Sequence, residues 1–423
     1  MSTKTTEKLK AELKEAELPK QPADPEKGAT ETFYVRVTGI DRPGILTSLL
    51  AVLSHCQATV RDIEQITIRQ RMILGLIVSL PANGSQHTRP DLFKDLLFYG
   101  WENDLNVEFE VVDSSHTKLQ PSYAVTLLGA QLRASDLRDA TNAIAQWGGN
   151  ISRIIRLSRK PVFSYELHVQ GGDLDNMRKE LLSTAASHPR LDIAFQVEGI
   201  VRRAKRLVAM DMDSTLIQNE VIDLLAEEAG CVEEVSRITE RAMAGELDFT
   251  ESLLKRVYLL EGLDEGALER AWKRLELSPG AQTFLRTLRR LGYRTAVVSG
   301  GFTYFTEKLA EELGVDFTCA NELEIKDGYL TGRVSGAVVD RQGKAKFLRD
   351  LAARESIPLA QTVAVGDGAN DLDMLEVAGL GIAYCANRSV QDAADTSLNV
   401  PFLDAVLYFL GLSSQEIEMA GKI

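Results

Sequence analysis

The sequence predicts an α/β protein of several domains, in which a Rossmann-like parallel sheet with a helical cap follows two small α+β units. The chain has 423 residues, about three times the length of an ordinary domain. Its first half repeats a pattern of strands and helices, and its second half alternates apolar strands with helices. Hydrophobic residues make up 44% and charged residues 26% of the chain, which is typical of globular proteins.

The first half contains two copies of the order βαββαβ. The first copy is predicted to comprise a strand at 33–39, a helix at 44–56, strands at 59–68 and 72–80, a helix at 91–101 and a strand at 107–112. The second is predicted to comprise a strand at 123–129, a helix at 135–147, strands at 151–157 and 162–169, a helix at 174–187 and a strand at 193–197. The turn glycines Gly39 and Gly129 lie 90 residues apart. Each copy predicts a ferredoxin-like sheet with helices on one face, and the exposed sheet edges favour a homodimer.

The composition excludes several classes of function. Lys and Arg number 48 against 61 Asp and Glu, and this net charge of -13 argues against binding to nucleic acid or to an anionic membrane. The four cysteines, Cys56, Cys231, Cys319 and Cys385, form no CxxC pair, so neither a zinc site nor a disulfide scaffold is predicted. Residues 1–30 predict a flexible solvated arm, not a signal peptide, and no apolar run approaches the roughly 20 residues of a membrane helix. We therefore expect a cytoplasmic protein.

A distinctive turn follows the first strand of the first unit. It reads Gly39-Ile40-Asp41-Arg42-Pro43-Gly44. Pro and Gly shape turns in many proteins, so these residues alone leave a purely structural turn open. A D-x-P-G turn inside a βαββαβ unit resembles the amino-acid-sensing ACT domain. This resemblance implies an effector site at Asp41, Arg42, Pro43 and Gly44. The second unit resembles an ACT domain by pattern only, because its turn lacks the Pro-Gly, and it is predicted to serve dimerisation.

The second half, from Lys205 onward, predicts a parallel sheet. Apolar runs at 207–210, 295–298 and 362–365 each end in a polar cluster and are followed by helical patterns. Continuous apolar strands that alternate with helices are typical of parallel sheets covered on both faces. Ligands bind such sheets at the carboxyl ends of the strands, so the polar clusters mark the predicted site.

Two of these clusters are acidic. Asp211-Met212-Asp213-Ser214-Thr215 follows the first run, and Gly366-Asp367-Gly368-Ala369-Asn370-Asp371 follows the third. Carboxylates that converge on one crevice repel each other unless a cation lies among them. Since only oxygen ligands are on offer, the pattern favours Mg²⁺ over zinc.

The remaining clusters suit a phosphate group. Ser299-Gly300-Gly301 offers a hydroxyl and open backbone N–H groups, and Lys344 supplies a positive charge. The four clusters in this order resemble the motifs of the haloacid-dehalogenase-like phosphatases, over about residues 206–412. Within that superfamily, Asp211-Met-Asp-Ser-Thr with Glu220, and the Ser-Gly-Gly-Phe segment, resemble the phosphoserine phosphatase family. The predicted organisation is then an arm at 1–30, ACT-like domains at 31–115 and 120–199, and a phosphatase domain at 204–423 with a cap at about 219–278.

The resemblance implies a role for each site residue. Asp211 would be the nucleophile that forms an aspartyl-phosphate, and Asp213 would be the general acid and base. Mg²⁺ would be held by Asp211, Asp367 and the backbone carbonyl of Asp213. The groups expected to stabilise the phosphoryl oxygens are Ser299, Gly300, Gly301, Lys344 and Asn370. Asp371 would support Lys344 or the water ligands of the metal. The implied reaction is hydrolysis of O-phospho-L-serine, the last step of L-serine biosynthesis, with L-serine as product and effector.

Residues of the predicted cap would recognise the rest of the substrate. The resemblance assigns Glu220 to the amino group and Arg256 to the carboxylate of phosphoserine, as a zwitterion requires one anion and one cation. It assigns Met243 and Phe249 to the apolar wall of the pocket. Simple packing within the cap explains Met243 and Phe249 almost equally well.

Other interpretations stay open or are set aside. The same scaffold could serve a phosphomutase or a phosphatase for another small phosphomonoester, or a non-enzymatic serine sensor. Cys231 and Arg237 match the Cys-x5-Arg pattern of tyrosine phosphatases, but two glutamates would stand where phosphate must bind, so an exposed cap helix is predicted. The five histidines, His55, His87, His116, His168 and His188, all precede residue 200, which excludes a phosphohistidine phosphatase in the second half.

Overall fold

The structure, a computed structural model, describes residues 31–80, 89–112, 120–243 and 246–422. The predicted arm at 1–30, His87 and His116 lie outside these ranges. The described residues belong to two units, one up to residue 112 and one from residue 120 onward, and each is described by itself. No helix in the described ranges is long and apolar enough to cross a membrane.

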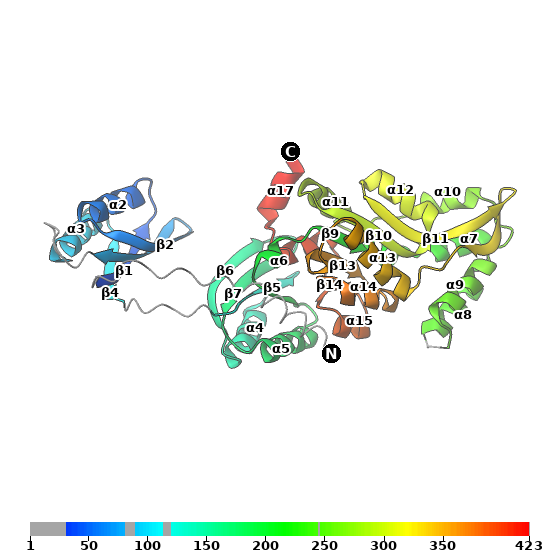
Figure 1. Ribbon diagram of the computed structural model, residues 1–423, viewed down its shortest axis with the longest axis horizontal. Coiled ribbons are helices and arrows are strands. Elements are labelled where there is room, and N and C mark those ends of the chain that lie inside the picture. The colour runs from blue at the N-terminus through cyan, green and yellow to red at the C-terminus, as the bar shows by residue number, and fades with distance from the viewer. Residues whose placement is uncertain (1–30, 81–88, 113–119, 244–245, 423) are drawn as a thin grey trace. The chain divides into compact units, whose positions relative to one another are not determined.

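The first unit has the predicted βαββαβ order (Figure 1). Its elements are β1 (Glu31–Ile40), α2 (Ile45–His55), β2 (Thr59–Ile68), β3 (Arg71–Leu80), α3 (Arg89–Glu102) and β4 (Asn106–Val111). The strands form an antiparallel sheet in the order β2-β3-β1-β4. Val35 and Val37 of β1 and Leu74 and Leu76 of β3 alternate into one buried core with Leu49 of α2, as period-two patterning requires.

The second copy repeats the same order. Its elements are β5 (Ser122–Gly129), α4 (Ala134–Gln146), β6 (Asn150–Ser158), β7 (Phe163–Gln170), α5 (Leu174–Ser187) and β8 (Asp192–Val197). The sheet order β6-β7-β5-β8 is equivalent to that of the first copy. Both predicted ferredoxin-like units are therefore confirmed.

A seven-stranded sheet forms the centre of the half of the chain that follows residue 199. Its order is β12-β11-β10-β9-β13-β14-β15, with β9 (Leu207–Met210), β10 (Arg294–Phe302), β11 (Phe317–Lys326), β12 (Tyr329–Ser335), β13 (Thr362–Gly366), β14 (Leu380–Tyr384) and β15 (Thr396–Leu398). All pairs are parallel except β11 with β12. Every residue of β9 is fully buried, because β9 lies in the middle of the sheet and helices cover both faces (Figure 1).

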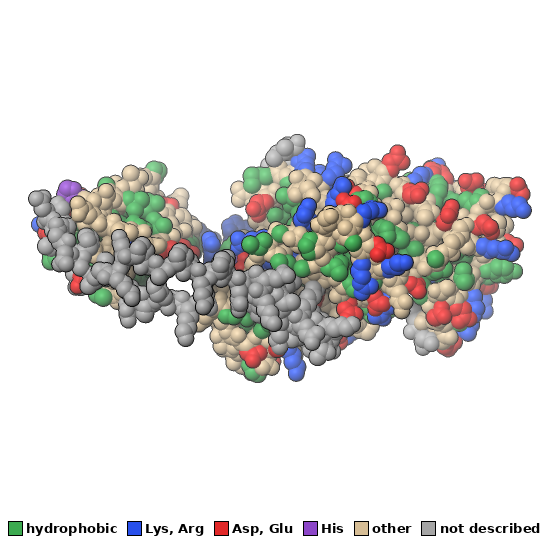
Figure 2. Space-filling view, in the orientation of Figure 1, with side chains coloured by type: hydrophobic (Ala, Val, Ile, Leu, Met, Phe, Trp, Pro, Cys, Tyr) green, Lys and Arg blue, Asp and Glu red, His purple; other side chains and the backbone are tan. Residues whose placement is uncertain are grey.

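Helices complete this half. They are α6 (Ile200–Arg203), α11 (Ala281–Arg290), α12 (Thr303–Leu313), α13 (Arg341–Arg354), α14 (Leu372–Val377), α15 (Arg388–Ala393), α16 (Val406–Phe409) and α17 (Ser414–Lys422). The insertion predicted at 219–278 is helical and contains α7 (Val221–Ala229), α8 (Val232–Met243), α9 (Phe249–Tyr258) and α10 (Gly266–Trp272). On the face shown in Figure 2, acidic and basic side chains are mixed over the surface of this half.

The second βαββαβ unit packs one face of its sheet against the half of the chain that contains the seven-stranded sheet. Leu128, Leu157 and Ala194 from this face belong to the same buried cluster as the core of that half. The Gln196 side chain donates a hydrogen bond of 2.8 Å to the carbonyl of Phe409 in α16. Asp192 accepts two hydrogen bonds, of 2.8 and 2.7 Å, from the backbone and side chain of Asn399. One buried cluster therefore spans this interface, while the opposite face of the smaller sheet has a core of its own.

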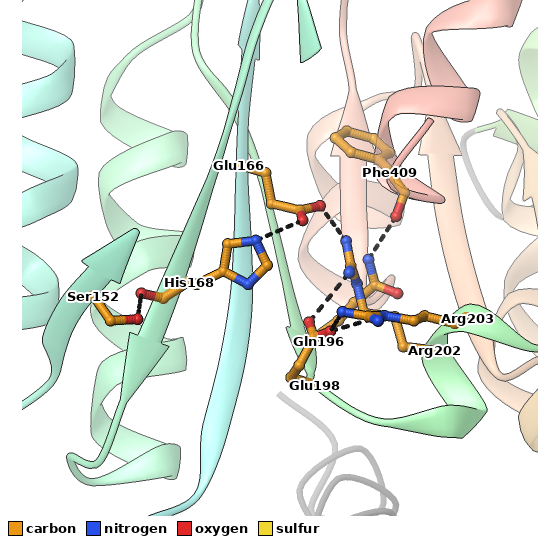
Figure 3. Close-up of polar contacts among 8 residues, drawn as sticks. All are labelled: Ser152, Glu166, His168, Gln196, Glu198, Arg202, Arg203 and Phe409. Atoms are coloured by element: carbon orange, nitrogen blue, oxygen red, sulfur yellow. Dashed lines mark hydrogen bonds and ion pairs between the residues drawn. The ribbon is translucent and has the colours of Figure 1, made fainter. Parts of the chain in front are cut away.

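Buried ion pairs attach α6, which precedes the seven-stranded sheet in the chain, to the sheet of the second βαββαβ unit (Figure 3). Arg202 of α6 has a side chain that is 5% exposed and forms ion pairs with Glu166 of β7 and with Glu198, the latter at 3.2 Å. Glu166 also pairs with His168 at 3.2 Å. The neighbouring Arg203 binds Glu198 at 2.6 Å, but its side chain is 70% exposed. Charges this deeply buried are stable only when paired.

The two arginines give a matched test of this junction. We expect Arg202→Met to lower the free energy of unfolding by about 3–5 kcal/mol, because it leaves Glu166 buried without its cation. Arg203→Met should cost less than about 1 kcal/mol, since its ion pair is exposed to solvent. Urea unfolding of both variants checks this. Equal losses of unfolding free energy in the two variants would show that burial of the Arg202 ion pairs does not increase their contribution to stability.

Candidate active site

The carboxyl ends of three neighbouring strands bring the predicted residues together. Met210 of β9 pairs with Val297 of β10 on one side and with Val365 of β13 on the other. The residues that follow these three positions therefore emerge at one edge of the sheet. The backbone N–H of Asp211 extends the ladder by one bond to the carbonyl of Val365, 2.9 Å away.

Asp211 and Asp213 occupy the centre of this edge. One oxygen of Asp211 accepts a hydrogen bond of 2.7 Å from the backbone N–H of Met212, and the other lies 2.7 Å from the Lys344 ammonium. Ser214 adopts a left-handed conformation with φ of 54°, which turns the chain directly after Asp213. The Asp213 carboxylate accepts hydrogen bonds from the backbone of Val221 at 2.9 Å and from the Ser299 hydroxyl at 3.2 Å.

Asp367, Asp371 and Lys344 complete the charged cluster. Lys344 is fully buried, and its ammonium lies 2.7 Å from Asp371 as well as 2.7 Å from Asp211. Asp371 also accepts a bond of 3.0 Å from the backbone of Gly368. The Thr215 hydroxyl donates to Asp367 at 2.8 Å, a contact that the sequence analysis did not anticipate although Thr215 lies in the first acidic motif.

Burial and mutual repulsion change the acidity of these groups. Burial raises the pKa of Asp211 well above its usual value, and Asp371 adds to the effect while Lys344 opposes it. Burial, followed by the nearby charge of Glu220, raises the pKa of Asp213 to about 7. Burial and Asp371 raise the pKa of Asp367 to about 7. Burial opposes the charge of Lys344, but Asp211 and Asp371 outweigh it and raise its pKa.

The acidic cluster fits a cation. One carboxylate oxygen from each of Asp211, Asp367 and Asp371 lies within 4.8 Å of the others. The donors are all oxygen atoms, which suits a hard divalent ion. Burial, together with the neighbouring carboxylates, keeps the pKa values of Asp211 and Asp367 raised although Lys344 lowers them.

The Ser-Gly-Gly segment lies within β10 but outside its regular pairing with β11. The Ser299 hydroxyl is fully buried and accepts a bond of 2.8 Å from the backbone N–H of Gly301. A Cβ atom on Gly300 would lie 2.6 Å from the ring of Phe249, and one on Gly301 would lie 2.7 Å from the carboxylate of Asp213. Glycine is required at both positions because larger residues would collide with their neighbours. The same contact places Phe249 of the cap over the Ser-Gly-Gly segment.

Four other residues are predicted to bind the substrate. Three of them lie around this edge of the sheet, and the side chain of the fourth is outside the described part of the structure. Glu220 is exposed and accepts a bond of 2.7 Å from the Ser214 hydroxyl. Arg256 in α9 is half-buried, and its charge interacts with that of Glu220. Asn370 is half-buried and folds back against Gly368. Met243 is the last residue of α8, and its side chain is outside the described part of the structure.

Two further predictions concern regions away from this site. Cys231 precedes α8, and Arg237 is exposed and pairs with Glu234 at 3.2 Å, as expected for a surface helix of the cap.

In the first unit, a cavity of about 400 Å³ is lined by Asp41, Arg42, Pro43, Gly44, Leu46, Thr47, Gln65 and Met72. Gly44 has φ of 95°, which favours glycine, and Asp41 accepts a bond of 2.8 Å from Thr67.

Comparison with known families identifies the class of protein. Residues 208–376 match the haloacid dehalogenase-like hydrolase family, and residues 31–110 and 121–196 each match ACT domains. The catalytic half is therefore a haloacid dehalogenase-like hydrolase domain, and two ACT domains precede it.

Comparison with individual relatives identifies the family within this class. Phosphoserine phosphatase of Streptomyces coelicolor is 47% identical over 395 residues, which cover 93% of this chain and 95% of the relative. Phosphoserine phosphatase SerB2 of Mycobacterium tuberculosis is 45% identical over 397 residues, which cover 93% and 96%. The crystal structure of a probable phosphoserine phosphatase from Vibrio cholerae has a TM-score of 0.54 at 35% identity, covering 73% of this chain and 91% of that one. The chain belongs to the phosphoserine phosphatase family.

The raised pKa values predict how stability depends on pH when divalent ions are removed with EDTA. Asp367 binds its proton more tightly in the folded than in the unfolded protein, so it favours folding at low pH. This contribution is lost as the pH rises from about 4, near the ordinary pKa of aspartate, to about 7, the pKa of Asp367 in the folded protein. We expect the melting temperature of Asp367→Asn to fall less than that of the wild type between pH 5 and pH 8. Parallel curves for the two proteins would contradict the assignment.

Proposed function

We propose that this enzyme hydrolyses O-phospho-L-serine to L-serine and phosphate through an aspartyl-phosphate, with Mg²⁺, as the last step of L-serine biosynthesis. The observation that carries the proposal is the arrangement of Asp211 and Asp213 at one strand end, with Lys344 at 2.7 Å from Asp211 and Ser299 at 3.2 Å from Asp213. It combines a nucleophile, a proton donor and groups that bind phosphate. The names of the relatives support the choice of substrate.

The two aspartates divide the chemistry between them. A carboxylate oxygen of Asp211 attacks phosphorus as the bond from phosphorus to the serine oxygen breaks, and Asp213 gives its proton to that oxygen. Asp213 then takes a proton from a water molecule that attacks the phosphorus. The bond between phosphorus and Asp211 breaks, which releases phosphate and restores both aspartates. Lys344 and the backbone N–H groups of the Ser-Gly-Gly segment bind the phosphoryl oxygens throughout.

Asp211, Asp367 and the backbone carbonyl of Asp213 would hold Mg²⁺. When bound, the ion offsets the charge of the phosphoryl group and of the carboxylates around it. The closely spaced carboxylate oxygens of Asp211 and Asp367 support the part of this assignment that concerns these two residues. Thr215 keeps Asp367 in place through its hydroxyl, at 2.8 Å. Asp371 holds Lys344 between itself and Asp211.

Opposite charges on the cap side of the site support an amino-acid ester as the substrate. Glu220 supplies a carboxyl group and Arg256 a guanidinium group, and the two interact electrostatically. The amino group and carboxylate of phosphoserine can each find a partner of opposite charge there. Another small phosphomonoester, or transfer of the phosphoryl group by a mutase, is the alternative.

Phosphate release from phosphoserine, phosphothreonine and an aryl phosphate tests the reaction. We expect phosphoserine to be the preferred substrate. Phosphate release should stop in EDTA and resume when Mg²⁺ is added. Asp211→Asn should lower turnover by several orders of magnitude, as loss of a nucleophile does. Asp373→Asn, which removes a carboxylate that binds Arg341 on α13, is the control. Normal turnover by Asp211→Asn would rule out an aspartyl-phosphate at this residue.

Arg256 tests the choice of substrate. Arg256→Ala should reduce kcat/KM for phosphoserine by about 10²-fold, because a charge-assisted hydrogen bond to the carboxylate contributes up to about 3 kcal/mol. Activity on the aryl phosphate should change little. Lys255→Ala is the matched control, since Lys255 is adjacent but pairs with Glu251 at 2.6 Å. Equal losses on both substrates would reject recognition of the carboxylate by Arg256.

We further propose that L-serine binds the first ACT domain and that the ACT domains join two chains in a dimer. The cavity beside Asp41 and Gly44 supports the first proposal. The edge strand β2 supports the second, because Ile63, Ile66 and Ile68 are 42%, 45% and 63% exposed on it.

Calorimetry and light scattering with L-serine test this regulation. We expect binding at millimolar serine or below, accompanied by a change in activity or assembly. Asp41→Ala should weaken binding by at least about tenfold without loss of basal activity, since it removes a polar group of the cavity. Gln131→Ala, at the equivalent position of the second ACT domain, should bind normally. Unchanged binding by Asp41→Ala would place the effector elsewhere.

A further inference from the structure

Asn321 connects two parts of the phosphate-binding machinery. It lies in β11, which β10 separates from β9, the strand that leads into Asp211 and Asp213, and it is 1% exposed. Its side-chain N–H donates a hydrogen bond of 2.8 Å to the carbonyl of Gly300. Its side-chain oxygen accepts one of 2.8 Å from the backbone N–H of Val339. Because one partner is a carbonyl and the other an N–H, a side-chain amide satisfies both at once.

The bond to Gly300 compensates for an interruption of the sheet. Val298 of β10 pairs with Cys319 of β11, and the next pair is Phe302 with Asn321. Between these pairs β10 advances by four residues and β11 by two, so residues 299–301 leave the ladder. The displaced Gly300 carbonyl is bound by the Asn321 side chain in place of a strand partner. A buried carbonyl without a partner would cost free energy and would allow the segment to move.

The bond to Val339 lies at the entrance to the helix that carries Lys344. Asp340 caps α13, with its carboxylate accepting from Gly343 at 2.8 Å and its carbonyl accepting from Lys344 at 2.9 Å. Val339 directly precedes this cap. The Asn321 amide therefore holds the Ser-Gly-Gly segment and the start of α13 at a fixed separation.

We propose that Asn321 is a positioning residue for phosphoryl transfer, which sets the backbone N–H groups of the Ser-Gly-Gly segment relative to Lys344. Donors that stabilise a transition state act only when their geometry is held in advance, so a small displacement lowers kcat. This role rests on phosphoryl transfer at the proposed site but not on the identity of the ester. Asn321 lies outside the four sequence motifs, so it would be an additional residue on which the rate of catalysis depends.

Two substitutions at this position and one control test the proposal. Asn321→Asp keeps the size of the side chain and the acceptor for Val339 but loses the donor to Gly300. Asn321→Ala loses both bonds. Leu323→Ala, on the same strand, removes a side chain that is 8% exposed and packs in the catalytic core, so it measures the effect of lost stability alone. For each variant we would measure melting temperature, kcat and KM on phosphoserine and an aryl phosphate, and inhibition by inorganic phosphate.

The expected result separates positioning from stability. In both Asn321 variants kcat should fall by about tenfold or more, by the same factor on the two esters, with a smaller change in KM. The inhibition constant for inorganic phosphate should rise severalfold. Leu323→Ala should lower the melting temperature while kcat and phosphate inhibition stay near wild type. Wild-type kcat and phosphate inhibition in Asn321→Asp, or losses no larger than those of Leu323→Ala, would overturn the proposal.

The experiment also distinguishes this proposal from the proposed substrate. If the wild type prefers another ester, the substrate assignment fails, and the aryl phosphate still reports on Asn321. If the wild type hydrolyses none of the esters, calorimetry with inorganic phosphate replaces the kinetic measurement. Weaker phosphate binding by Asn321→Asp would then support positioning, and equal binding would refute it.

Discussion

The charge balance around Lys344 is the constraint on which the active site depends. Asp211, Asp213, Asp367 and Asp371 lie at the end of buried strands, where ionised carboxylates are costly and repel each other. Lys344 is fully buried and contacts two of them at 2.7 Å, and burial still raises the pKa of Asp211, Asp213 and Asp367. The fold thus keeps a cluster of acids that is suited to receive a cation together with an anionic substrate.

The reactive groups lie on segments that depart from regular secondary structure, and a single side chain stabilises each of these segments. Ser214 takes a left-handed conformation directly after Asp213, and its hydroxyl binds Glu220. The Ser-Gly-Gly segment of β10 is not paired with β11, and the Asn321 side chain donates a hydrogen bond to the Gly300 carbonyl there. The parallel sheet brings the strand ends together, while these local bonds decide the positions of individual atoms.

The two ACT domains share an element order but differ in what covers them. In the second domain, one sheet face is buried against the catalytic domain through apolar residues, Gln196 and the ion pairs of Arg202 (Figure 3). In the first domain, the turn that contains Asp41 and Gly44 lines a cavity. The second copy has Gln131 in place of this aspartate and lacks the Pro-Gly. The second ACT domain is therefore packed against the catalytic domain, whereas the first has a cavity beside its turn at Asp41 and Gly44.

Sequence patterns were sufficient to predict the order of the elements, the parallel sheet and the position of three of the four motifs at strand ends. These features follow from local periodicity and from the rule that parallel strands end at one edge, so they need no knowledge of distant contacts. Tertiary structure alone decided that Thr215 binds Asp367 and that Asn321 connects Gly300 with Val339. It also decided that Arg202 is buried while the adjacent Arg203 is exposed. These contacts join residues far apart in the chain, and a side chain's partners depend on packing that no local pattern encodes.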